Sequence, residues 1–319
     1  MSTSVLVTGG AGFIGSNLAD LLLREGHAVH VVDNLSHGRR IQVPPEAKFH
    51  ELDIRDGAAL HDVAVAAGPA IIYHLAAQAD VRRAIEEPSF DADVNIIGTI
   101  AVLEAARAVG ARVVFASTGG AGYGEYDALP VPSPETAETR PLSHYGMSKM
   151  AGEGYIHLYG RLYGVEGVCL RLGNVYGPRQ DPHGEAGVVA IFCGKMLDGE
   201  PPRVFGDGLQ TRDYVYVGDV CRAFLAAATG PVGETVNIGA GREVTVLDLI
   251  AGLGGDLEPE FAPARTGELQ RSALDPAKAA RLLGWRAEIS LAEGLALTYE
   301  SVAATRRDPG ARPQGAFPQ

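Results

Sequence analysis

The sequence contains few of the residues that mark several common classes of protein. Only three cysteines occur among the 319 residues, Cys169, Cys193 and Cys221, and none forms a CxxC pair. An odd number of cysteines without metal-ligand spacing argues against a disulfide scaffold and against a zinc site. The three residues are therefore predicted to be reduced, mostly buried thiols in a cytoplasmic protein.

Long apolar runs and an excess of positive charge are also absent. The first residues, MSTSVLVTGG, lack the basic and apolar regions of a signal peptide, and no apolar run reaches the length of a membrane helix. The formal net charge is -12, and only four lysines are present. An acidic chain of this kind lacks the basic face that nucleic acids require. The sequence predicts neither a nucleic-acid partner nor a membrane partner, and arginines would have to hold any anionic ligand.

The chain does contain short apolar runs that alternate with amphipathic stretches. The runs are β-branched and nearly continuous, which is typical of parallel strands covered on both faces. The predicted strands are Val5–Thr8, Val29–Asp33, Ile71–Leu75, Val113–Ser117 and Val168–Leu172. The predicted helices are Gly12–Arg24, Ala58–Ala67, Asp91–Val109 and Ser143–Tyr163. Alternation of this kind predicts an α/β protein with a doubly wound parallel sheet, the Rossmann architecture.

A change in pattern after residue 172 predicts a second domain. Residues 1–172 are expected to form the dinucleotide-binding domain, and about 213–240 are expected to rejoin it through a strand (Asp213–Val217) and a helix (Asp219–Ala228). Residues 173–212 and 241–305 would form a smaller C-terminal α/β substrate-binding domain. The segment 306–319 is rich in Pro, Gly and Arg, which predicts a mobile tail.

A glycine-rich loop follows the first predicted strand. Gly9, Gly12 and Gly15 have the spacing GxxGxxG, with Phe13 and Ile14 between the last two. Glycine permits a tight turn and lets the backbone approach a pyrophosphate, which then lies at the N-terminus of the following helix. The loop alone is equally compatible with simple packing of a helix on a sheet. The acid at the end of the second strand, Asp33, adds specificity, because a carboxylate there binds the ribose hydroxyls of NAD and repels the 2′-phosphate of NADP.

Tyr145 and Lys149 are four residues apart on a predicted helix, so both project from one face. The ammonium group of Lys149 would favour the tyrosinate and lower a pKa that starts near about 10. A tyrosine in this state can remove a hydroxyl proton while hydride leaves the same carbon. A hydroxyl at the end of the strand Val113–Ser117 would complete a catalytic group with Tyr145 and Lys149. Both Ser117 and Thr118 are available for this role.

Together these motifs resemble the extended short-chain dehydrogenase/reductase family, and within it the bacterial UDP-glucose 4-epimerases. The resemblance extends from Val5 to about Trp285 and rests on TGGAGFIG, Asp33, Asp53-Ile54, His74-Leu-Ala-Ala77, Asn95, Tyr145-Gly-Met-Ser-Lys149 and Asn174-Val-Tyr-Gly-Pro-Arg179. It implies an NAD cofactor, bound by residues in the glycine loop and after the strands. Those residues are Gly9, Gly12, Phe13, Ile14, Gly15, Asp33, Asn34, Asp53, Ile54, Leu75, Ala76, Ala77, Asn95, Ser117, Tyr145 and Lys149.

The resemblance also implies roles in catalysis and substrate binding. Thr118, Tyr145 and Lys149 would be catalytic, with Thr118 hydrogen-bonded to the sugar and Ser117 nearer the cofactor. Arg212 and Arg265 would clamp a diphosphate, since arginine forms charge-assisted hydrogen bonds with phosphate oxygens. The implied substrate-binding set is Thr118, Asn174, Val188, Phe205, Arg212, Arg265, Glu268 and Ser272, and no metal is implied. Arg171, Arg179 and Arg271 are expected to be structural.

The residues after Thr118 distinguish between reaction types. Sugar dehydratases that resemble this chain carry an Asp–Glu pair there, and related decarboxylases carry a glutamate, whereas this sequence has Gly119 and Gly120 and no carboxylate before Tyr123. The expected reaction is therefore 4-epimerisation of a nucleotide sugar through a 4-keto intermediate, with UDP-glucose and UDP-galactose as the default pair. Alternatives are an epimerase for a dTDP-hexose or UDP-glucuronate, a 4-keto-sugar reductase, and a non-catalytic NAD-sensing regulator.

Two further expectations concern the sugar pocket and assembly. Ser272 lies near a position where a tyrosine excludes N-acetyl groups in some epimerases, so a small residue is expected to admit UDP-N-acetylglucosamine. No added arginine occurs in His183–Phe192 to pair with a uronate. The helices Asp91–Val109 and Ser143–Tyr163 carry apolar residues on more than one face, which predicts a homodimer built on a four-helix bundle.

Overall fold

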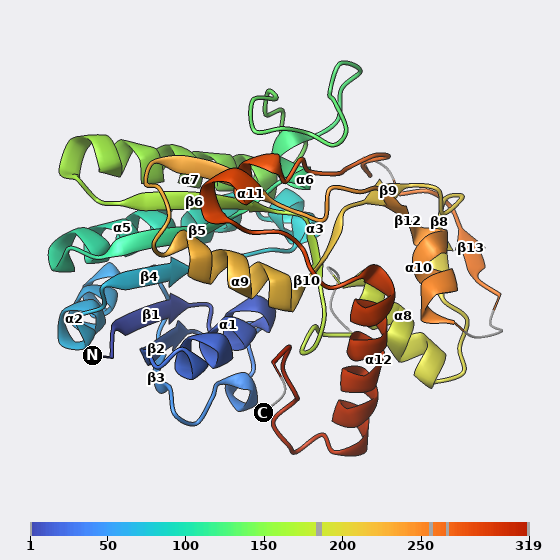
Figure 1. Cartoon of the computed structure of the whole chain (residues 1–319), viewed down its shortest axis with the longest axis horizontal. Helices are drawn as coiled ribbons and strands as arrows, with labels where there is room; N and C mark the ends of the chain where they lie inside the picture. The colour runs from blue at the N-terminus through green and yellow to red at the C-terminus, as the bar shows by residue number, and fades with distance from the viewer. Residues whose placement is uncertain (1, 183–186, 255–257, 266–267, 318–319) are drawn as a thin grey trace.

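The computed structural model describes residues 2–182, 187–254, 258–265 and 268–317. Figure 1 shows a large sheet with helices on both faces, and beside it a smaller lobe that contains α8, α10 and α12. The architecture confirms the predicted doubly wound α/β fold. Within the described residues, no helix is long and apolar enough to cross a membrane.

The large sheet has seven parallel strands in the order β11-β6-β5-β4-β1-β2-β3. Apolar residues alternate between its two faces: Val5 and Val7 of β1 belong to one buried cluster, and Leu6 belongs to the other. The strands are β1 Ser4–Thr8, β2 Ala28–Asp33, β3 Lys48–Glu51, β4 Ile71–His74, β5 Arg112–Thr118, β6 Gly167–Leu172 and β11 Glu234–Ile238.

Two groups of helices cover the sheet. One face carries α2 Gly57–Ala67, α5 Gly98–Val109 and α7 His144–Tyr163, and the other carries α1 Phe13–Arg24 and α9 Val217–Ala227. The helix α7 begins where Ser143 accepts a hydrogen bond from the Gly146 N–H, and it ends at Gly164, whose φ of 71° suits glycine. Shorter helices are α3 Val81–Glu86, α4 Pro88–Ala92, α6 Gly120–Tyr123 and α11 Ala277–Leu283.

The predicted helix Asp91–Val109 is interrupted in the structure. The segment consists of α4, a π-helical turn at Asp93–Ile97 and then α5. Asn95 lies within this turn, where its side chain bonds to the backbone of Gln78 in both directions. Because a π turn adds a residue to the helical repeat, it changes which side chains face the sheet. Hydrophobic periodicity alone does not reveal such an interruption.

The segment after residue 212 also differs from the expected pattern. The predicted strand Asp213–Val217 corresponds to β10 Tyr214–Tyr216, which pairs with β7 Asn174–Tyr176 rather than with the large sheet. The strand that joins the large sheet is β11, next to β6. It was not predicted because Glu234 and Asn237 interrupt its apolar run. The helix α9 connects the two and packs against α1.

The smaller lobe combines three helices and short strand pairs. Its helices are α8 Val188–Leu197, α10 Val246–Leu253 and α12 Leu291–Arg307. The strand pairs are β8 Arg203–Phe205 with β13 Glu260–Ala262, and β9 Thr211–Arg212 with β12 Val244–Thr245. A small apolar cluster of Phe192, Val204 and Val246 fills this lobe.

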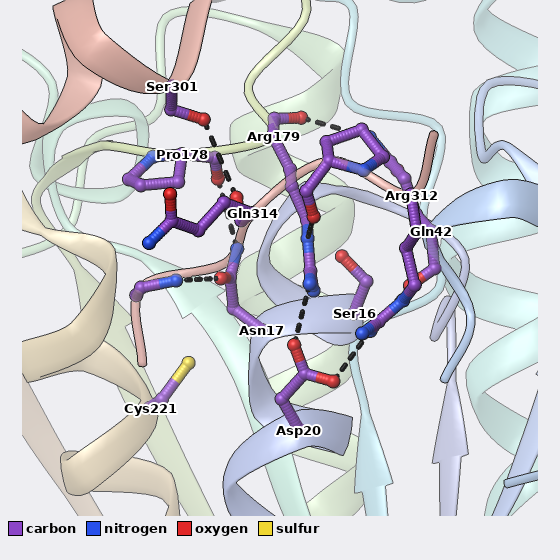
Figure 2. Close-up of polar contacts among 12 residues, drawn as sticks. Ser16, Asn17, Asp20, Gln42, Pro178, Arg179, Cys221, Ser301, Arg312 and Gln314 are labelled. Atoms are coloured by element: carbon purple, nitrogen blue, oxygen red, sulfur yellow. Dashed lines mark hydrogen bonds and ion pairs between the residues drawn. The ribbon is translucent and has the colours of Figure 1, made fainter. Parts of the chain in front are cut away.

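The C-terminal segment, which its composition predicts to be a mobile tail, makes defined contacts with the first domain in the structure. The residues after α12 lie against α1, as Figure 2 shows. The backbone N–H of Ala316 donates to Asn17 Oδ1 at 2.7 Å, and Arg312 donates to Asp20 at 2.5 Å. A composition rich in Pro, Gly and Arg predicted mobility, but the backbone and arginine of this segment find polar partners on the first domain. Residues 318 and 319 lie outside the described part of the chain.

Asp20 joins the C-terminal segment to the loop after β7, which contains Arg179. Its second carboxylate oxygen accepts a hydrogen bond from Arg179 at 2.6 Å, and Arg179 also donates to the Pro313 carbonyl at 3.0 Å. The Arg179 side chain is only 1% exposed, so it requires this compensation. Arg179 therefore has the structural role expected from the sequence, as do Arg171 and Arg271, which pair with Glu153 and Glu243.

Candidate active site

A pocket lies at the carboxyl ends of β1, β2 and β4, where parallel α/β sheets bind their ligands. It contains most of the predicted cofactor residues, including Gly9, Gly12, Asp33, Asn34, Asp53, Ile54, Leu75, Ala76 and Ala77. Further lining residues that the sequence did not single out include Ser36, His37, Gly38, Gln78, Arg83, Phe90 and Val94. Ser36, His37, Gly38 and Gln78 follow recognised motifs within a few residues, and Val94 directly precedes Asn95, so their proximity in sequence was the available signal. Arg83 and Phe90 lie farther from any motif and had no such signal.

The glycine loop leaves no room for side chains. A Cβ at Gly9 would lie 2.7 Å from the Ala76 nitrogen, and a Cβ at Gly15 would lie 2.2 Å from the Gly9 carbonyl oxygen. Gly9 also has a φ of 72°. Gly12 is the N-cap of α1, and Phe13 and Ile14 lie in the first turn of this helix. This cradle fits a pyrophosphate at a helix N-terminus.

Asp33 is held at the end of β2 by two backbone hydrogen bonds. Its Oδ2 accepts from the Ala11 N–H at 2.9 Å, and its Oδ1 accepts from the Leu35 N–H at 2.8 Å. Burial raises the pKa of Asp33 above its usual value, while these two hydrogen bonds act in the opposite direction. Asn34 donates to Asp53 at 2.9 Å, and both of these predicted cofactor residues line the pocket. The residues therefore fit an adenosine ribose beside a carboxylate.

Tyr145 and Lys149 lie on the first turns of α7, which packs against β5. Lys149 is 3% exposed; its Nζ donates to the Ala116 carbonyl at 2.8 Å and lies 4.8 Å from the centre of the Phe115 ring. Burial lowers the pKa of Lys149 to about 8. Burial, and then the charge of Asp91, raise the pKa of Tyr145 to about 12. A tyrosine with this pKa holds its proton at neutral pH.

The structure separates the two candidate hydroxyls at the end of β5. Ser117 is 3% exposed and donates to Glu153 at 2.5 Å, within a buried group that includes Arg171. Thr118 is partly exposed, and no hydrogen bond to its hydroxyl occurs among the described residues. The geometry favours Thr118 as the hydroxyl that is free to bind a ligand. The Ser117 hydroxyl is buried and donates its hydrogen bond to Glu153.

Asn95 and two residues that the sequence did not single out, Gln78 and Asp91, form a hydrogen-bonded group that reaches α7 at Ser148. Asn95 and Gln78 are mutually hydrogen-bonded, and the buried carboxylate of Asp91 accepts hydrogen bonds from both. Asp91 also accepts from Ser148, 57 positions away in the chain. An aspartate at the start of a predicted helix gave no signal, since acidic residues are common in the first turn of helices.

Six of the eight predicted substrate residues lie together in three pairs. Arg212 pairs with Glu268 at 3.3 Å, and the guanidinium of Arg265 lies 3.8 Å from the centre of the Phe205 ring. Asn174 and Val188 line one small cavity with Tyr214. Residues 266–267, between the second arginine and Glu268, and 183–186, in the stretch without an added arginine, lie outside the described residues.

Ser272 lies near the end of β5, which presents Thr118. A Cβ added at Gly120 would lie 3.0 Å from Ser272 Oγ, and one added at Gly119 would lie 2.5 Å from Leu274. Asp213 fixes this segment, because its carboxylate accepts a hydrogen bond from the Leu274 N–H at 3.0 Å. The two glycines after Thr118 therefore make room for the segment that contains Ser272.

The pocket, the glycine cradle and the Tyr–Lys pair define a dinucleotide-dependent enzyme that acts on a hydroxyl-bearing carbon. More particularly, the chain belongs to the NAD dependent epimerase/dehydratase family, whose sequence model matches residues 5–239.

Relatives and solved structures cover nearly the whole chain. A UDP-glucose 4-epimerase of Mycolicibacterium smegmatis is 47% identical over 307 residues, which are 92% of this chain and 97% of that protein. The structure of a UDP-glucose 4-epimerase with UDP-glucose from Thermotoga maritima has a TM-score of 0.93 and 46% identity, covering 95% and 99% of the two chains. A UDP-glucose 4-epimerase of Thermus thermophilus in complex with NAD has a TM-score of 0.88 and 44% identity, covering 94% and 98%.

Proposed function

We propose that this protein is an NAD-dependent isomerase that interconverts UDP-glucose and UDP-galactose by 4-epimerisation. The observation that carries the proposal is the Thr118–Gly119–Gly120 segment beside the Tyr–Lys pair. Side chains at the two glycines would collide with Leu274 and approach Ser272, so the acid and base that elimination requires have no place there. A site with one proton-transferring tyrosine and a dinucleotide pocket supports oxidation and return of hydride. The similarity to UDP-glucose 4-epimerases over nearly the whole chain supports the same reaction.

The residues of the chain have distinct roles in this reaction. Arg212 and Arg265 hold the diphosphate. Glu268 accepts a hydrogen bond from a ribose hydroxyl, and this bond takes the place of its ion pair with Arg212. Tyr145 takes the proton from the sugar's 4-hydroxyl and later returns it, while Thr118 orients that hydroxyl. Lys149 favours the tyrosinate through its positive charge. NAD held in this pocket would supply the hydride acceptor and donor that oxidation and re-reduction at carbon 4 of the sugar require.

The pocket favours NAD over NADP. The Asp33 carboxylate stands where a ribose 2′-phosphate would be bound, and like charges repel. Arg40, a nearby residue that could offset this repulsion, places its guanidinium 4.6 Å from the centre of the Phe49 ring. This preference argues against a 4-keto-sugar reductase that consumes NADPH, and the presence of both Tyr145 and Lys149 argues against a non-catalytic NAD-sensing regulator.

The purified protein provides the direct test. Heat-denatured protein should release NAD or NADH, and NMR should show UDP-glucose turning into UDP-galactose without added cofactor. A steady requirement for NADPH would point to the reductase instead. Parallel assays with dTDP-glucose and UDP-glucuronate would reveal the two alternative epimerase substrates.

Ser272 is proposed to leave room for an N-acetyl group on the sugar. Its hydroxyl lies close to Gly120, beside the strand end that presents Thr118. We expect Ser272→Tyr to reduce turnover of UDP-N-acetylglucosamine by roughly tenfold or more and to retain UDP-glucose turnover, because a ring fills that space. Ser272→Ala, which keeps the small volume, should change neither. Equal handling of both sugars by the tyrosine variant would rule out Ser272 as the gate.

A homodimer is proposed from the outward faces of α5 and α7. Ile97, Met147, Leu162 and Tyr163 are each at least 46% exposed in the single chain, and they lie on these helices or on the turn that precedes them. Pairing of the two helices with their copies about a two-fold axis would bury these side chains. Light scattering at micromolar concentration should give the mass of a dimer, and a monomer there would contradict the proposal. The three free, buried cysteines support a reducing, cytoplasmic location.

A further inference from the structure

Asp91 is a buried carboxylate beside the catalytic helix. Its side chain belongs to α4, and the residue is 1% exposed. It accepts hydrogen bonds from Ser148 at 2.6 Å, Asn95 at 2.9 Å and Gln78 at 3.3 Å. Burial of a carboxylate is costly unless hydrogen bonds compensate it, so three donors at one site indicate a role for the charge.

The three donors come from three parts of the active site. Gln78 lines the dinucleotide pocket, and Asn95 belongs to the π-helical turn that is bonded to it. Ser148 lies on α7 between Tyr145 and Lys149. Asp91 therefore links the wall of the pocket to the helix that presents the catalytic pair. A displacement of α4 would move the pocket wall and this helix relative to each other.

The charge of Asp91 also affects the pKa values of both Tyr145 and Lys149. Its carboxylate raises the pKa of Tyr145 and, against the larger effect of burial, raises that of Lys149. Glu153 acts in the same direction on Lys149, but its carboxylate is bonded to Arg171. His74 also lies near Lys149, but burial lowers its pKa to about 3, so its imidazole is neutral at physiological pH.

We propose that Asp91 is a positioning residue that keeps Lys149 in its ammonium form and holds α7 against the dinucleotide pocket. The inference rests on the proposed roles of Tyr145 and Lys149 and adds the group that maintains their charge state. Lys149 makes its one direct polar contact among the described residues with a neutral carbonyl, that of Ala116. A buried ammonium needs a counter-charge, and Asp91 provides one from the neighbouring helix.

The sign of the expected effect follows from this arrangement. Because one carboxylate raises both pKa values, its removal should lower both. The two limbs of a pH–rate profile report the coupled pair rather than either residue alone, so both limbs should move to lower pH, whichever group each one reflects. Asp91→Asn, which keeps the shape and removes the charge, should shift the whole profile by roughly one pH unit.

Lysine NMR gives a readout that is independent of turnover. The chain has only four lysines, so protein labelled with ¹⁵N-lysine gives few side-chain signals, and Lys149→Arg identifies the one of interest. In Asp91→Asn the Lys149 ammonium should lose its proton at a pH roughly one unit lower than in the wild type. Asp91→Ser removes the same charge with a smaller side chain and serves if the asparagine variant does not fold.

Two variants separate charge from geometry. Asp91→Glu keeps the charge and alters the hydrogen bonds, and Ser148→Ala removes one donor and leaves the charge in place. Both should retain the wild-type pH profile, even where kcat falls. The proposal is overturned if the neutral variants titrate Lys149 at the wild-type pH and keep both limbs in place. In that case a large loss of activity in Tyr145→Phe would still support the proposed function.

Discussion

Tyr145→Phe should lower turnover by about 10²- to 10⁴-fold, the usual contribution of a positioned acid/base. The substitution removes only the hydroxyl that is proposed to take the proton from the sugar. Tyr145 is partly buried on α7, and phenylalanine preserves its ring, so the fold and the bound dinucleotide should persist. Steady-state epimerisation followed by NMR, together with the NAD content of the purified variant, measures both effects.

Tyr163→Phe is the matched control for this prediction. Tyr163 lies at the other end of the same helix and is 46% exposed, so loss of its hydroxyl should leave turnover within about twofold. Near-normal activity of Tyr145→Phe would remove Tyr145 from the mechanism. A parallel loss in both variants would indicate a structural effect on α7 instead.

Gly15→Ala protein should no longer retain NAD through purification. The added methyl group would lie 2.2 Å from the carbonyl oxygen of Gly9 and 2.8 Å from the Gly10 Cα. Both partners are backbone atoms of the pyrophosphate cradle, and a backbone cannot move aside as a flexible side chain can. We expect NAD affinity to fall by roughly 100-fold or more, since a displacement of about 1 Å has effects of that size. Isothermal titration with NAD and the cofactor content after purification measure it.

Gly154→Ala is the matched control, because it makes the same glycine-to-alanine change at a site away from the glycine loop. Gly154 lies within α7, and a Cβ there has no atom within 4 Å. Alanine favours helices over glycine by about 1 kcal/mol, so this variant should be as stable as the wild type or slightly more so, with full NAD content. If Gly15→Ala retained its cofactor, the glycine cradle would not be the pyrophosphate site.

The alternation of strands and helices in the first half of the chain was predictable because local patterns encode it. Residues 5–8 and 29–33 form buried strands through their own apolar character, and the helix around Tyr145 has a serine at its start and a glycine at its end. The glycine loop, Asp33 and the Tyr–Lys pair have fixed spacings within single elements. Their positions at the carboxyl ends of the strands then follow from parallel topology.

Other features depended on contacts between distant segments. Asp91 meets Ser148 across 57 positions, and Asp20 meets Arg312 across 292. The approach of Ser272 to Gly120 and the pairing of β11 with β6 are of the same kind. A polar residue such as Asp91 looks like any exposed acid in sequence, because its partners are selected by packing rather than by neighbouring residues.

By itself the sequence determined the class of fold, which the alternation of strands and helices encodes. It also supplied the glycine loop and the Tyr145–Lys149 pair that we propose to be catalytic, since each lies in a short run of the chain. Only the tertiary structure decided between Ser117 and Thr118 as the free hydroxyl, revealed the buried carboxylate behind the pair, and placed the C-terminal segment on α1. The physical reason is that burial, charge compensation and hydrogen bonding among distant residues are properties of the packed chain. A local pattern specifies which residues are present, and packing determines which of them meet.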